Sequence, residues 1–232
     1  AGARTPMGGL QGDLSSLTAV ELGEAAIRAV LARANLEGGA VDEVIMGCVL
    51  PSGLRQGPAR QAAIDAGIPV SVGATTINKL CGSGMKAAML AFDQIKAGTN
   101  QIMVAGGMES MSRAPYLLPK VRTGLRMGHG ELQDAMFTDG LEDAKTGRLM
   151  GAFAQDVADQ FQVTREDMDD YAIKSLQKAL AAIENDALTD EIVPVEISTR
   201  AGKVVISIDE QPGKANLDKI KTLKVGVDTL TL

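Results

Sequence analysis

The sequence predicts an α/β fold in which a parallel or mostly parallel sheet is covered by helices and joined by a helix-rich region. Two observations predict this fold. Short apolar strands alternate with amphipathic helices up to about residue 105, a pattern typical of parallel sheets. Beyond residue 107 the chain becomes loop-rich and then carries long helical stretches. We therefore interpret the second half as an inserted subdomain rather than as more of the sheet.

Apolar spacing and end signals predict the elements of the first part. Thr18 and Glu21 have the spacing of a capping box, so a helix should run from there to about Ala34. The elements that follow are a buried strand over 41–50, a short helix over 58–66 with a proline in its first turn, a β-branched strand over 74–77, a helix closed by a glycine at residue 98, and a buried strand over 101–105.

The second part begins with a segment rich in glycine and proline, residues 108–130. Thr164 and Asp167 again have capping-box spacing, and they predict the start of a long helix. The predicted elements are a short helix over 131–137, a helix over 150–161, the long helix over 164–185, and strands over 192–197 and 204–208.

Composition excludes several classes of function. The net charge is −6 and the pI about 4.9, with no basic patch dense enough for nucleic acid. No apolar run reaches the ~20 residues that span a bilayer, and no signal peptide is visible, so we expect no membrane partner. Two cysteines suggest neither a disulfide framework nor a closed zinc site, so we expect a reducing compartment and no metal.

Cys81 is the candidate catalytic residue. It lies where a short apolar stretch becomes a helix whose apolar residues recur three and four positions apart. The N–H groups and dipole at a helix start favour an anion, so a thiolate there should be a good nucleophile. The alternative is a buried cysteine that acts as a small hydrophobe. The predicted sheet supports the catalytic interpretation of Cys81. Cys81 and Gly106 would each follow the carboxyl end of a strand, and in parallel sheets ligands bind at that edge.

These residues resemble the thiolase family. The segment Asn-Lys-Leu-Cys-Gly-Ser-Gly-Met-Lys-Ala at 78–87 is similar to the family's nucleophile segment, and Gly-Gly-Met-Glu-Ser-Met-Ser at 106–112 is similar to a second signature. The resemblance covers almost the whole chain, and within the family the sequence most resembles the acetyl-CoA acetyltransferases. Other motifs match in order: Arg-Thr-Pro at 4–6, Asp-Gly-Leu at 139–141, Met-Gly at 150–151, Thr-Arg-Glu at 164–166, and Asp-Glu-Ile-Val-Pro at 190–194.

The resemblance implies an acyltransferase that condenses two acetyl-CoA molecules to acetoacetyl-CoA, or performs the reverse thiolysis, through an S-acyl intermediate on Cys81. Coenzyme A thioesters would be substrates, and no cofactor is implied. By position in the family, Leu141 and Met150 would line the pantetheine, and Lys214 would lie near the nucleotide. Core packing is the alternative for Leu141 and Met150, and a solvated surface position is the alternative for Lys214.

The chain also departs from the family. Thiolases have two similar α/β halves, and the catalytic histidine of a Gly-His-Pro motif, the second catalytic cysteine of a Cys-x-Gly motif and an oxyanion-hole asparagine belong to the second half. Neither motif occurs in this sequence. We interpret His129 as a surface-loop residue and Cys48 as a buried structural thiol. The strand before Arg4 is missing too, and residues 225–232 do not follow the family pattern. We expect the 232-residue chain alone to be inactive or nearly so.

The resemblance divides the chain into an N-terminal thiolase α/β domain at 1–110 that lacks its first strand, and an incomplete loop domain at 111–232. It implies a homodimer or a homotetramer, assembled through a loop at about residues 115–127. The implied location is cytoplasmic, or the mitochondrial matrix or peroxisome in a eukaryote. Alternatives are a 3-ketoacyl-CoA thiolase of broader chain length, a ketoacyl synthase, and a non-catalytic CoA-binding or assembly fragment.

Overall fold

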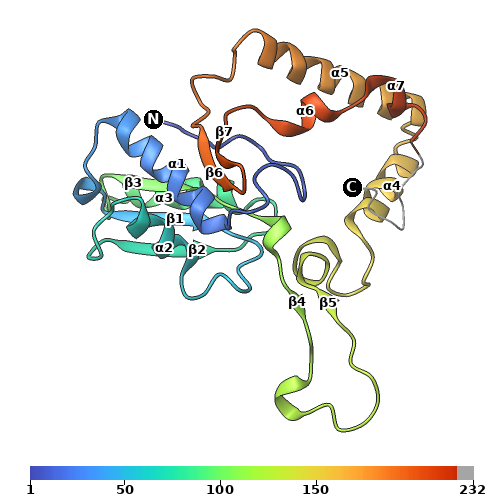
Figure 1. Cartoon of the computed structure of the whole chain (residues 1–232), viewed down its shortest axis with the longest axis horizontal. Helices are drawn as coiled ribbons and strands as arrows, with labels where there is room; N and C mark the ends of the chain where they lie inside the picture. The colour runs from blue at the N-terminus through green and yellow to red at the C-terminus, as the bar shows by residue number, and fades with distance from the viewer. Residues whose placement is uncertain (224–232) are drawn as a thin grey trace.

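The centre of the fold is a three-stranded parallel sheet in the order β2-β1-β3, seen at the left of Figure 1. The computed structural model describes residues 1–223, so the segment 225–232 lies outside the described residues. The three strands and the three helices of this part are β1 (Glu43–Gly47), β2 (Gly73–Ile77), β3 (Met103–Gly107), α1 (Ala19–Ala34), α2 (Pro58–Asp65) and α3 (Ser83–Lys96). The predicted parallel α/β arrangement is confirmed.

The central strand β1 is buried on both faces. Val44 and Met46 belong to the main hydrophobic cluster, together with Ile27 of α1 and Ala62 of α2. Gly47 instead faces α3, because a Cβ built there would lie 2.5 Å from the Cβ of Ser83. Helices therefore cover both faces, which explains why β1 reads as a continuous apolar run rather than an alternating one.

Helix α1 forms as its sequence predicts. The Thr18 hydroxyl accepts the Glu21 N–H, and the Glu21 side chain accepts the Thr18 N–H, so the capping box is complete. Its buried face carries Ile27 and Leu31 into the main hydrophobic cluster. Asn35 ends the helix in the left-handed conformation, with φ +52°.

Helix α3 forms where predicted, yet its large apolar stripe does not face the sheet. Helix and sheet meet through the small side chains of Ser83, Ala87 and Ala91, which are the buried residues of α3. Small residues allow the helix to lie close to the strands. The large side chains of the stripe are exposed in the described structure: Met85, Met89, Phe92 and Ile95.

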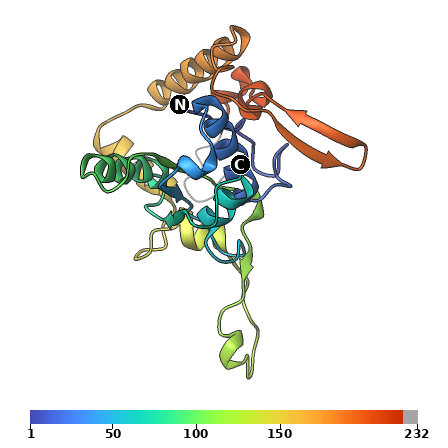
Figure 2. The same cartoon turned by 90° about the vertical axis from the view of Figure 1, so that its left-hand side faces the viewer.

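Two antiparallel hairpins extend from the body: the first projects in both Figure 1 and Figure 2, and the second is seen to project in Figure 2. The first joins β4 (Tyr116–Leu117) to β5 (Gln133–Asp134), and the second joins β6 (Val195–Thr199) to β7 (Gly202–Ile206). The predicted helix at 131–137 is therefore wrong at its start. Helical structure begins only at Ala135, directly after β5, where the Asp134 carboxylate accepts the Met136 N–H, 2.9 Å from nitrogen to oxygen. It continues as a π-helical turn, Phe137–Leu141.

Helices α4 and α5 form where the sequence predicts them, and two short helices, α6 and α7, follow that the sequence did not predict. Helix α5 begins with a second complete capping box, formed by Thr164 and Asp167. These helices are α4 (Met150–Gln160), α5 (Arg165–Glu184), α6 (Glu210–Lys214) and α7 (Leu217–Ile220). Among the described residues, no helix is long and apolar enough to span a bilayer.

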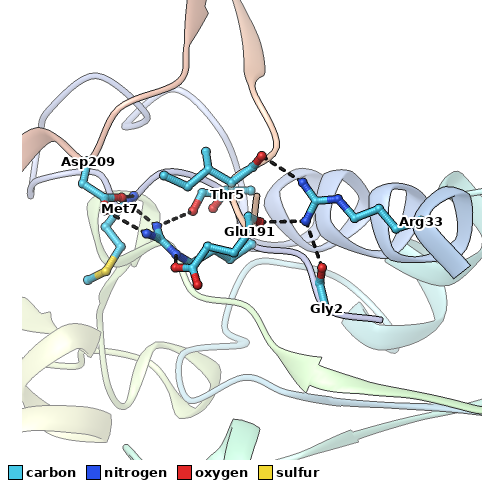
Figure 3. A network of polar contacts seen from close by, with 8 residues as sticks. Gly2, Thr5, Met7, Arg33, Glu191 and Asp209 are labelled. Atoms are coloured by element: carbon cyan, nitrogen blue, oxygen red, sulfur yellow. Dashed lines mark hydrogen bonds and ion pairs between the residues drawn. The ribbon is translucent and has the colours of Figure 1, made fainter. Parts of the chain in front are cut away.

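A network of polar contacts joins the N-terminal segment to residues 191–209 (Figure 3). The Arg4 guanidinium donates to both carboxylate oxygens of Asp209, at 2.7 and 2.9 Å, and pairs with Glu191. Arg33 reaches from α1 to the Gly2 and Ile192 carbonyls. These bonds raise the pKa of Arg4 and lower that of Asp209, chiefly through their mutual hydrogen bonds.

Candidate active site

The three parallel strands end at one edge of the sheet, and the segments that leave them enclose a cavity of about 410 Å³. Ligands in such sheets bind beyond the carboxyl ends of the strands. The segments after β1, β2 and β3 contribute to the lining, together with the π-helical turn. The lining residues that bear on the chemistry are Val49, Leu50, Cys81, Glu109, Met136 and Leu141.

A strained turn presents Cys81 to this cavity. Leu80, directly before it, has φ +49°, in the left-handed region that costs a β-carbon-bearing residue about 1–3 kcal/mol. Neighbouring side chains hold the turn: the Asn78 amide oxygen accepts the Leu80 N–H at 2.9 Å, and the buried Ser83 hydroxyl accepts the Lys79 N–H at 2.8 Å. The same hydroxyl donates to the Leu80 carbonyl at 2.5 Å.

The Cys81 thiol is exposed and lies at the start of α3. It immediately precedes Gly82, the residue that caps this helix, so the first-turn N–H groups and the positive end of the dipole are adjacent to it. This placement agrees with the geometry expected from the sequence and favours a bound anion or a thiolate at the same place.

Two glycines, Gly47 and Gly107, let α3 begin directly against the strand ends. A Cβ at Gly47 would lie 2.5 Å from the Ser83 Cβ and 2.8 Å from the Gly84 nitrogen. A Cβ at Gly107 would lie 3.2 Å from the Gly84 Cα. Because side chains at these positions would push α3 away, the glycines set how closely the turn with Cys81 approaches the sheet edge.

The side chains of Glu109 and Cys48 lie together at the edge of the sheet that carries Cys81. The Glu109 carboxylate accepts the N–H of Val49 at 2.7 Å and of Leu50 at 3.1 Å, and the Cys48 sulfur lies 3.6 Å from it. Burial, and then the charge of Glu109, raise the pKa of the Cys48 thiol to about 12. The Cys48 thiol is buried, as predicted, and its raised pKa keeps it protonated near neutral pH.

The structure brings one of the three predicted CoA contacts into the cavity. Leu141 lines it with Cys81. Met150 is the first residue of α4, half exposed, and is not among the cavity's lining residues. His129 lies exposed in the hairpin between β4 and β5, outside the lining of the Cys81 cavity.

Lys214 lies on α6 and is paired with acidic groups. Its ammonium contacts the carboxylate of Glu210, four residues earlier, and that of Asp13 at 3.4 Å. Glu210 in turn accepts the N–H of Gly9 and of Asp13 at 2.8 and 2.9 Å. The bond from Lys214 and these two N–H groups lower the pKa of Glu210 to about 2. In the described structure, Lys214 therefore helps to hold the N-terminal segment against α6.

Sequence reasoning did not assign roles to Asn78, Ser83 and Glu109, although all three lie inside the quoted motifs. The signal was their position: a side-chain amide and a hydroxyl flank the cysteine, and a carboxylate lies two residues beyond a strand end. Within residues 1–223, no group of three His, Cys, Asp or Glu side chains is placed to hold a metal ion.

Comparison with known proteins identifies the family of the chain. The family described as "Thiolase, N-terminal domain" matches residues 1–229. The chain therefore belongs to the thiolase family. It is 50% identical over 223 residues to acetyl-CoA acetyltransferase 2 of Arabidopsis thaliana, covering 96% of this chain and 55% of the relative. It is 50% identical over 213 residues to the acetyl-CoA acetyltransferase of Pseudomonas aeruginosa, covering 91% and 54%.

A solved structure confirms the fold. The chain is similar to the Acat5 thiolase of Ascaris suum in complex with coenzyme A, with a TM-score of 0.90 and 38% identity. That likeness covers 97% of this chain and 56% of the solved one. The chain thus spans about half the length of the curated relatives that it matches.

Proposed function

We propose that this chain supplies the acyl-accepting cysteine of an acetyl-CoA C-acetyltransferase, which condenses two acetyl-CoA molecules to acetoacetyl-CoA or catalyses the reverse thiolysis. The observation that carries the proposal is the placement of Cys81: an exposed thiol at a helix N-terminus, opening on a cavity of about 410 Å³. The names of the relatives and the CoA complex of the similar thiolase support the choice of substrate.

The site suits the first half of the reaction. The Cys81 thiolate attacks the carbonyl carbon of the thioester, a C–S bond to Cys81 forms, and the bond to the sulfur of coenzyme A breaks. Coenzyme A leaves as a thiolate that takes up a proton. Thiolates are both good nucleophiles and good leaving groups, so the acyl enzyme divides one hard step into two easier ones. The Cys81 N–H would donate to the developing oxyanion. No cofactor enters this scheme.

The apolar lining suits the rest of the ligand. We propose that Leu141 contacts the pantetheine, since it shares the cavity with Cys81. The proposals for Met150 and Lys214 rest on the family resemblance alone. Lys214 would have to exchange its contact with Glu210 for a phosphate, because that carboxylate now neutralises it.

Acetylation of the chain itself tests the proposal. The 232-residue protein is incubated with acetyl-CoA, and acetyl groups on Cys81 and Cys48 are quantified by mass spectrometry. Cys81 should be acetylated faster in the native protein than in the urea-unfolded chain, and Cys48 should not react. Cys81→Ser should abolish labelling, whereas Cys48→Ser, the matched control, should leave it unchanged. Equal labelling of native and unfolded Cys81 would overturn the proposal.

We also propose that the hairpin between β4 and β5 mediates self-association to a homotetramer. It projects from the body in both views (Figures 1 and 2), and it carries exposed large apolar side chains, which mark interaction surfaces. Sedimentation of the protein and of Met127→Ser tests this. Met127 is 98% exposed, so its replacement should weaken association without unfolding the protein. An unchanged mass distribution at every concentration would count against the hairpin.

We propose a cytoplasmic location, with the mitochondrial matrix or peroxisome as the eukaryotic alternatives. One acetyl-CoA acetyltransferase that matches 96% of this chain, from Gibberella zeae, is named as cytosolic. Fractionation of cells that express the tagged protein would test the location.

A further inference from the structure

We infer that Glu109 is a positioning residue that fixes the wall of the Cys81 cavity formed by Val49 and Leu50. The inference rests on the proposed function in treating Cys81 as the acyl acceptor. Its physical basis is separate: a carboxylate at the end of one strand holds the backbone that leaves the neighbouring strand.

The wall begins where β1 ends. Val49 and Leu50 leave the central strand at the edge that carries Cys81, and both line the cavity. Leu50 is buried, and a Cβ at Gly140 would lie 3.5 Å from its Cδ2. The wall therefore packs against the π-helical turn that brings Leu141 into the same cavity.

The wall has side-chain anchors from both neighbouring strands. Glu109, just after β3, accepts the N–H groups of Val49 and Leu50 through its two carboxylate oxygens. Asn78, just after β2, donates its amide to the Val49 carbonyl at 3.3 Å. The bonds to Glu109 are shorter and charge-assisted, and such bonds are about twice as strong as neutral ones. Glu109 is therefore the stronger anchor.

Replacement by glutamine would disturb this arrangement without changing its size. A glutamine has one acceptor oxygen, and its NH₂ group would face a second N–H donor. One of the two wall N–H groups would lose its partner. The wall would open more often, and the cavity would discriminate less between small and large reagents that approach Cys81.

The test uses the 232-residue protein and Glu109→Gln. Amide hydrogen exchange is followed at Val49 and Leu50, and Cys81 is alkylated with iodoacetamide and with its N-hexyl derivative. We expect exchange at one or both wall amides to rise about tenfold or more, in keeping with the loss of a charge-assisted bond. We expect the ratio of the two alkylation rates to change about threefold or more. Neither readout needs turnover, so acetylation of Cys81 can fail while this inference stands.

Two further variants make the result decisive. Glu43→Gln is the matched control, because Glu43 lies at the opposite end of β1 and its carboxylate contacts Asn100 and Thr75. It should leave both readouts unchanged. Asn78→Asp keeps the acceptor for the Leu80 N–H but loses the donor to Val49, so it should loosen the wall in the same direction. Unchanged exchange at Val49 and Leu50 in folded Glu109→Gln would overturn the inference, as would an unchanged alkylation ratio. If Glu109→Gln does not fold, Glu109→Asp, whose shorter side chain does not reach both N–H groups in place, takes its part in the test, and unchanged exchange at Val49 and Leu50 in it would overturn the inference.

Discussion

Gly47→Ala should destabilise the protein and displace its candidate nucleophile. The added Cβ would lie 2.5 Å from the Ser83 Cβ, 2.6 Å from the Ser83 carbonyl carbon and 2.8 Å from the Gly84 nitrogen. Two of these neighbours are backbone atoms, which cannot rotate away. Ordinary contact begins at 3.4 Å, so the start of α3 must move by about 0.9 Å.

The expected cost follows from this displacement. Forcing one extra methyl group into a packed interior costs about 1–3 kcal/mol. With a urea dependence of about 2 kcal/mol per molar, a loss of 2 kcal/mol lowers the unfolding midpoint by about 1 M. Because Cys81 lies on the displaced turn, its acetylation by acetyl-CoA should slow as well, by up to about 100-fold for a misplacement near 1 Å.

Gly106→Ala is the matched control for this experiment. Gly106 lies on the neighbouring strand β3, and the nearest atoms to its added Cβ would be the Met46 sulfur at 3.5 Å and its terminal methyl at 3.6 Å. These contacts are ordinary, so the variant should keep wild-type stability or gain about 0.4–1 kcal/mol. The reasoning is refuted if Gly47→Ala unfolds at the same urea concentration as Gly106→Ala and acetylates Cys81 as fast.

Three further predictions concern caps, charges and thiols. Thr18→Ala should lower the free energy of unfolding by about 1 kcal/mol because the α1 capping box is lost, and Thr18→Ser should not; urea titration checks both. Glu210 has its pKa lowered from 4.5 to about 2, so it stabilises the protein above pH 4.5, and this contribution should be lost as the pH falls toward 2. Glu210→Gln should therefore show a smaller drop in urea midpoint between pH 6 and pH 3 than the wild type, and an equal drop would contradict this. Cys81 should be alkylated by iodoacetamide faster than the buried Cys48, whose pKa is raised to about 12, and equal native rates would contradict an accessible Cys81.

The sequence predicts the sheet and its helices well because their signals are local. The capping boxes of Thr18 and Thr164 mark the helix starts within one residue, and β1 reads as a buried strand because helices cover both of its faces. The short helix predicted at 131–137 fails for a different reason. Residues 133 and 134 pair with a strand 16 or more positions earlier, and local spacing does not report such pairing.

The candidate site is only partly predictable for the same physical reason. The position of Cys81 follows from one continuous motif, since the turn and the helix start are both local. The anchor at Glu109 is formed across about 60 residues of chain, by a carboxylate after β3 and two N–H groups after β1. Periodicity cannot indicate such a bond. The topology of the sheet can indicate it, because polar residues that follow adjacent parallel strands meet at one edge of the sheet.

The central strand connects these findings, because one short segment determines both sides of the cavity. At Gly47 the absence of a side chain lets the turn with Cys81 approach the sheet edge. Two residues later the backbone of Val49 and Leu50, held by Glu109, forms the facing wall. The two effects are separable by experiment. Gly47→Ala should change both the acetylation rate of Cys81 and the stability of the protein. Glu109→Gln should change the amide hydrogen exchange of Val49 and Leu50 and the ratio of the two Cys81 alkylation rates. If both variants altered the same readouts to the same degree, the site would behave as one cooperative unit, and the separate roles argued for these residues would be wrong.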